Sequence, residues 1–167
     1  MRCVLPLVIF ALAACSQQTP AEKAAADARA IAEVNAAQDV KPPAKPIAPQ
    51  AIGFFDITQN KLSASGCNFV ADGGGMGAVL LAQAERAVMK VGDKLVILAA
   101  DKGSAALPQG AWSRYSGREY ALTLTRIEGG KASKAGVVEM FDAKVTVTDP
   151  HDQVVYDARG QAQCKPM

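Results

Sequence analysis

Short apolar stretches alternate with turn-forming residues from Cys67 to the end of the chain. Residues 139–148 show the pattern best, because Phe141, Ala143, Val145 and Val147 alternate with polar side chains. Successive side chains of a β-strand point to opposite faces, so this pattern predicts a half-buried strand. Strands are predicted over 68–71, 78–82, 86–91, 94–99, 119–127, 139–148 and 153–164.

The connections between these stretches favour antiparallel pairing. Gly92-Asp93 is a two-residue hairpin signal, 73–77 and 149–152 are turns, and 100–113 and 128–136 are loops. Six or so short strands with regular turns predict a mainly β fold, either a small antiparallel barrel or a sandwich. The apolar patch before it, Phe54, Phe55, Ile57 and Leu62, fits a short helix or an irregular first strand.

Residues 16–50 carry almost no large apolar side chain. Thr19 and Glu22 form a capping-box pattern around Pro20, and an alanine-rich run to about Gln38 favours a helix. The prolines of 41–49 then favour extended polyproline II. We therefore expect a tether that is helical or disordered. It divides the chain into a signal peptide (1–14), a lipidated cysteine with its tether (15–50) and a folded domain (51–167).

The N-terminus indicates export. The apolar run from Cys3 to Cys15 spans about 13 residues, too few for the ~20 of a transmembrane helix. Its end, Leu12-Ala13-Ala14-Cys15, resembles the lipobox of bacterial lipoproteins. That resemblance implies cleavage before Cys15, acylation of Cys15 with palmitate-type chains, and, with Ser16 next, a lipid anchor on the periplasmic face of the outer membrane. The alternative is an ordinary signal peptide whose cleavage site happens to precede a cysteine.

Two cysteines remain in the folded part, Cys67 near its beginning and Cys164 near its end. In an oxidising compartment such a pair is expected to form a disulfide, with two free thiols as the alternative. A metal site is not expected, because no second cysteine pair accompanies them and His151 is the only histidine.

Composition and motifs point away from several function classes. The net charge is +2 with no basic cluster, which argues against nucleic-acid binding. The glycines of 73–77 lack the Lys-Ser/Thr of a phosphate loop, and the Asp-Pro-His-Asp sequence of 149–152 reads as a hairpin turn. The carboxylates are scattered and no Gly-x-Ser-x-Gly motif occurs. We therefore expect no enzyme activity, no cofactor and no metal.

One segment, 112–120, concentrates the residue types enriched at binding hot spots. Its candidate binding residues are Trp112, Arg114, Tyr115, Ser116, Arg118 and Tyr120. The alternative interpretation is structural: Trp112 and Tyr120 plug the ends of a small barrel while the arginines lie in solvent.

Ser116-Gly117-Arg118-Glu119-Tyr120 is similar to the Ser-Gly-x-x-Tyr motif of the periplasmic, lipid-anchored inhibitors of C-type lysozyme. That resemblance implies a loop that enters the lysozyme cleft, with Ser116 and Tyr120 at the matching positions. The Lys-Gly pair that follows the motif in that family is displaced here to Lys102-Gly103, before the motif.

Residues 51–167 also resemble Gram-negative envelope lipoproteins that share the Gly66-Cys67-Asn68-Phe69 start and a closing cysteine, and this resemblance implies a fold but no activity. We therefore expect a lipid-anchored, non-catalytic binding or structural module. Its partners would be the membrane, through the anchor, and an envelope protein or a cell-wall component. The alternative function is inhibition of a lysozyme-like cell-wall hydrolase.

Overall fold

The computed structural model describes residues 19–38 and 41–167, and the chain divides into two compact units, with the boundary in the sequence between Pro42 and Pro43. The described part of the first unit is helix α1, Pro20–Gln38, whose side chains are all exposed. Its capping box is present: the Thr19 amide and hydroxyl both donate to Glu22 Oε2 at 2.8 Å. Both hydrogen bonds lower the pKa of the Glu22 carboxyl, and the bond from the backbone amide has the larger effect.

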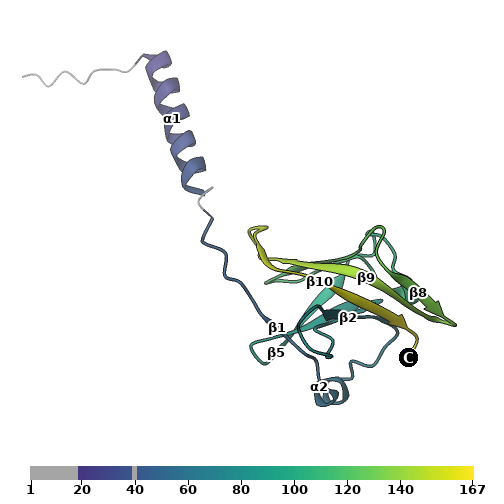
Figure 1. Ribbon diagram of the computed structural model, residues 1–167. Coiled ribbons are helices and arrows are strands. Elements are labelled where there is room, and N and C mark those ends of the chain that lie inside the picture. The colour runs from purple at the N-terminus through teal and green to yellow at the C-terminus, as the bar shows by residue number, and fades with distance from the viewer. Residues whose placement is uncertain (1–18, 39–40) are drawn as a thin grey trace, which may run out of the picture. The chain divides into compact units, whose positions relative to one another are not determined.

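The second unit consists of ten strands with two short helical segments (Figure 1). In chain order the elements are β1 (Pro49–Gln50), α2 (Phe54–Gln59), β2 (Gly66–Ala71), β3 (Leu80–Gln83), β4 (Arg86–Val91), β5 (Lys94–Ala100), the 3₁₀ turn η1 (Pro108–Gly110), β6 (Arg114–Ser116), β7 (Ala121–Arg126), β8 (Ala132–Ala135), β9 (Val138–Thr148) and β10 (Val154–Lys165).

Antiparallel pairing closes these strands into a barrel. The order β4-β3-β2-β10-β9-β7-β6-β5 returns to its start because β5 also pairs with β4. Strand β1 adds to β4 at Lys90 and Val91, and β8 adds to the first residues of β9. The mainly β prediction is confirmed, and its two alternatives resolve in favour of the barrel. The number of strands is higher than the six or so expected.

The barrel interior is filled by the alternating apolar side chains. On β9 the predicted inward set, Phe141, Ala143, Val145 and Val147, is buried. Phe69, Leu80, Met89, Leu98, Leu122 and Leu124 complete most of the packing from the neighbouring strands. A cavity lined by apolar residues remains among the core side chains. Its volume is about 10 Å³, roughly the space that one water molecule needs. A space of this size in the barrel interior cannot hold a ligand.

A second, smaller core lies on the outside of the barrel. Leu81 and Val88 project outward from β3 and β4, and Ile52 and Leu62, which flank helix α2, cover them. This outer core explains why residues 78–82 are continuously apolar, because β3 is buried on both faces. Of the predicted apolar patch, only Leu62 is buried and Ile57 partly buried, while Phe54 and Phe55 are about three-quarters exposed.

An ion pair holds α2 against β4. Lys90 Nζ lies 3.1 Å from Asp56 Oδ2, and the Gly53 amide donates to the same oxygen at 2.9 Å. The hydrogen bond from the Gly53 amide lowers the pKa of the Asp56 carboxyl most, and the hydrogen bond from Lys90 lowers it further. The short helix is thus the alternative that the structure selects for this segment.

The second unit begins before the expected boundary at Ala51. The Ile47 amide donates to the Val155 carbonyl at 2.9 Å, Ile47 packs on the main core, and β1 pairs with β4. Residues 47–50 are therefore part of the barrel and not of the tether, because their backbone groups and one apolar side chain have partners there.

Candidate functional site

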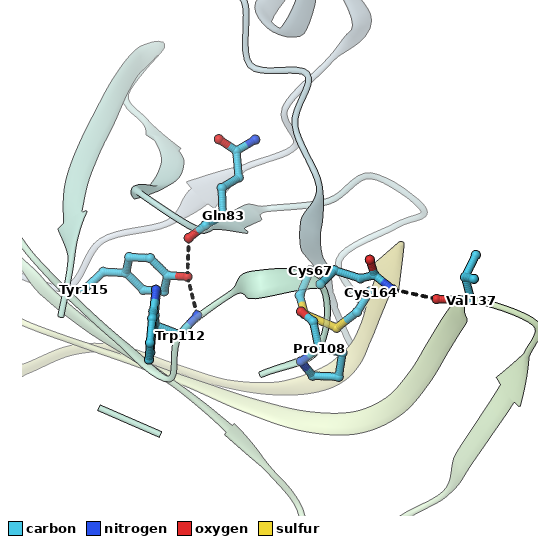
Figure 2. The surroundings of a disulfide bond; sticks show 8 residues. Cys67, Gln83, Pro108, Trp112, Tyr115, Val137 and Cys164 are labelled. Carbon is cyan, nitrogen blue, oxygen red and sulfur yellow. Dashed lines mark hydrogen bonds between the residues drawn. A yellow bond between two sulfur atoms is a disulfide. The ribbon is translucent and has the colours of Figure 1, made fainter. Parts of the chain in front are cut away.

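The disulfide between Cys67 and Cys164 is confirmed (Figure 2). The two residues face each other in the β2–β10 pairing and are fully buried. The Pro108 carbonyl oxygen of η1 lies 3.5 Å from Cys67 Sγ, so the loop of residues 101–113 closes over the bridge. Burial by this loop separates the bridge from solvent and makes it part of the core.

Tyr115 is a core residue, which corrects its placement among the candidate binding residues. Only 1% of its surface is exposed. Its hydroxyl donates to the Gln83 carbonyl at 2.8 Å and accepts from the Trp112 amide at 2.8 Å (Figure 2). Burial raises the pKa of the Tyr115 hydroxyl to about 12. The hydroxyl of this buried side chain fastens the loop of residues 101–113 to the end of strand β3, and the ring cannot contact a partner.

Trp112 has a similar, less buried role. Its ring is half-buried against the main core, and its indole Nε1 donates to the Ala84 carbonyl at 3.0 Å. The hydrogen bonds of Trp112 and Tyr115 therefore end on adjacent residues, Ala84 and Gln83. This arrangement supports the structural interpretation of Trp112.

The other candidates belong to the β6–β7 hairpin. Arg114, Ser116 and Arg118 are exposed, while Tyr120 is half-buried against the main core. The Gly117 amide donates to the Tyr120 carbonyl at 2.9 Å, and a Cβ on Gly117 would lie 2.7 Å from Leu98 Cδ2. The six predicted residues do not converge: two hold a loop, one packs on the core and three lie in solvent.

The remaining sequence motifs serve the backbone. Asp149 Oδ1 accepts from the amides of His151 and Gln153 at 2.8 and 2.9 Å, as expected for a turn between β9 and β10. Residues 73–77 form turns and bends between β2 and β3. Within the described ranges no three His, Cys, Asp or Glu side chains are grouped so that they could hold a metal ion. The predicted lipidation site, Cys15, lies outside the described residues.

The structure adds a groove that sequence reasoning missed. It has a volume of about 510 Å³ and lies on the outer face of the barrel where β2, β10 and β9 meet. Its lining residues are Asp72, Ile127, Lys131, Asp142, Arg159, Gly160 and Gln161. They come from four separate parts of the sequence. The available signal was the charged and polar character of the outward positions Asp142, Arg159 and Gln161 on two predicted strands.

Comparison with known proteins leaves the site to be interpreted from its own chemistry. No family model, no curated protein and no solved structure matches the chain. Within residues 19–38 and 41–167, no helix combines the length and apolar character required to cross a membrane.

Replacing Tyr115 with phenylalanine should lower the free energy of unfolding by about 1–3 kcal/mol, because the Gln83 carbonyl and Trp112 amide lose a buried partner. The loss should shrink between pH 10 and pH 12. The folded protein keeps the Tyr115 proton in this range, while the unfolded chain releases it, so the wild type loses stability as pH rises. Urea unfolding of the wild type and of Tyr115→Phe, at pH 8 and near pH 11, measures the difference in unfolding free energy. A difference that is constant with pH would contradict the assignment.

Proposed function

We propose that the protein is a lipid-anchored component of the bacterial envelope, held on the periplasmic face of the outer membrane, and that its barrel acts as a non-catalytic binding or structural module. The filled barrel interior is the observation that carries the binding role, since it leaves the outer surface as the place for recognition. The lipobox-like sequence ending at Cys15 supports the anchor.

Two further features agree with this location. The Cys67–Cys164 bridge suits an oxidising compartment such as the periplasm. Helix α1, with 19 exposed residues, is about 28 Å long at ~1.5 Å per residue, and the proline-rich segment adds extended length. A spacer of this kind would hold an anchored barrel clear of the lipid surface.

The anchor can be tested with two cysteine variants. We expect Cys15→Ser to remove incorporation of labelled palmitate and to release the protein from the membrane fraction. Cys3→Ser is the matched control, because the lipobox resemblance gives Cys3 no role in acylation, and it should leave both properties unchanged. Labelling of the Cys15→Ser protein, or its retention in the membrane fraction, would refute the anchor.

Inhibition of a lysozyme-like hydrolase is the second candidate. The observation in its favour is that Ser116 and Arg118 are exposed on one hairpin, with Tyr120 half-buried in the turn between its strands. If this hairpin enters an enzyme cleft, Ser116→Ala should weaken inhibition of C-type lysozyme, and Ser133→Ala on the exposed strand β8 should not. Absence of inhibition by the intact protein would eliminate this candidate.

A further inference from the structure

A loop that hydrogen bonds hold in place forms one wall of the groove on the outer face. The loop of residues 127–131, which joins β7 to β8, is fixed to Asp142 by three hydrogen bonds. The Ile127 amide donates to the Asp142 carbonyl, the Asp142 amide donates to the Lys131 carbonyl, and the Lys131 amide donates to Asp142 Oδ2, each at 2.9 Å. Because these bonds are made without a ligand, the wall is preorganised.

Glycines shape the groove on both sides. A Cβ on Gly130 would lie 2.9 Å from the Asp142 Cβ, so glycine allows the loop to approach β9 closely. On the floor, Gly160 of β10 lies so close to β2 that a Cβ would come within 2.1 Å of the Val70 carbonyl oxygen. Gly160 also separates Arg159 and Gln161, the two exposed residues that β10 contributes to the groove.

The groove carries charges of both signs. Asp72 and Asp142 supply two carboxylates, and Lys131 and Arg159 supply two cations. In the described part of the chain, none of these four side chains forms an ion pair. Immediately beside the groove, by contrast, Lys144 and Asp157 on the same two strands pair at 2.8 Å.

The charge pattern selects the class of ligand. A neutral ligand such as a simple sugar would cover four charged groups without pairing them, which costs free energy. A ligand whose charged groups all have the same sign would face two groove side chains of that sign. A ligand with one positive and one negative group can pair with both kinds, and Gln161 and Ile127 add an amide and an apolar contact.

We propose that this groove binds a dipolar peptide, a short chain with a free carboxylate and a free ammonium group. Arg159 and Lys131 are the cations available to the carboxylate, and Asp72 and Asp142 are the carboxylates available to the ammonium group. Such peptides come from two sources, the stem peptides of the cell wall and fragments of proteins. The inference deepens the binding role proposed above, but it does not depend on the anchor, because binding can be measured whether or not the chain is acylated.

Calorimetric titration of the full chain in detergent tests the groove. The probes are trialanine, the cell-wall tripeptide L-alanyl-γ-D-glutamyl-diaminopimelic acid, and N-acetyl-trialanine amide, which lacks both terminal charges. We expect saturable binding of at least one dipolar peptide. Preference for the cell-wall tripeptide would identify the stem peptide as the source, and preference for trialanine a protein fragment. Absence of binding by both, or equal affinity for the capped peptide, overturns the proposal.

Variants locate the binding on the molecule. Arg159→Gln and Asp72→Asn remove exposed charges without a protein ion pair, and each should weaken binding by about tenfold or more. Lys94→Gln removes an exposed cation from strand β5, which contributes no residue to the groove, and affinity should stay within about twofold because solvent screens this charge. Thermal unfolding of each variant verifies folding. An equal loss in Lys94→Gln and Arg159→Gln overturns the groove as the site.

Discussion

Replacing both Cys67 and Cys164 with alanine should lower the free energy of unfolding by about 3–5 kcal/mol. The bridge joins residues 97 positions apart, and a loop of roughly 100 residues corresponds to ~4.7 kcal/mol of chain entropy in the unfolded state. Alanine is the suitable replacement because both side chains are fully buried, and serine would add an unpaired hydroxyl. Urea unfolding under non-reducing conditions measures the loss.

The single variants provide the control for the disulfide. Cys67→Ala and Cys164→Ala should each lose nearly as much as the double variant, because either change removes the same bond. The reduced wild type should fall to a similar stability. Stability losses that add between the two single variants would show that local packing, and not the cross-link, dominates.

Replacing Gly160 with alanine should cost about 3 kcal/mol or more and lower the midpoint of urea unfolding accordingly. The added Cβ would lie 2.1 Å from the Val70 carbonyl oxygen and 2.9 Å from the Ala71 Cα, both backbone atoms that cannot rotate away. Relief of this clash requires β10 and β2 to separate at this end of their pairing, and the hydrogen bonds between them would weaken.

Gly129→Ala is the matched control for Gly160→Ala. Gly129 has a φ of 70°, and nothing lies within 4 Å of an added Cβ, so the expected cost is only the ~1 kcal/mol of a left-handed alanine. Equal losses for the two variants would contradict the extra cost that we assign to the close approach of β10 to β2 at Gly160.

The strands with a strong alternation were predictable from the sequence. Strand β4 occupies the predicted residues 86–91, and β5 ends at Ala100, one residue beyond the predicted 94–99. Strand β8 lay in a predicted loop because all four of its residues are exposed, so no alternation marks it and pairing with β9 defines it. Strand β6 is three residues long, too short to show a period.

The candidate site was less predictable, for a physical reason. Tyrosine and tryptophan favour both binding surfaces and cores, and only the tertiary structure shows that Tyr115 points inward. The groove needs information that no local pattern contains. Gln161 and Asp142 become neighbours through the β10–β9 register, and Asp72 reaches Arg159 through a backbone hydrogen bond at 2.9 Å.

The position of the disulfide also determines how the molecule would respond to mechanical force. A pull on the chain at Pro43 acts first on the hydrogen bond of Ile47, then on β1 and on the Asp56–Lys90 pair that holds α2. It stops at Cys67, where the covalent bond passes the tension directly to Cys164 on β10. The bridge prevents the chain beyond Cys67 from being drawn out in line with the pull, so extension is limited to residues 43–67, about 80 Å at ~3.4 Å per residue. Strand β10, which carries Arg159 and Gln161, therefore lies at the end of this force-bearing path.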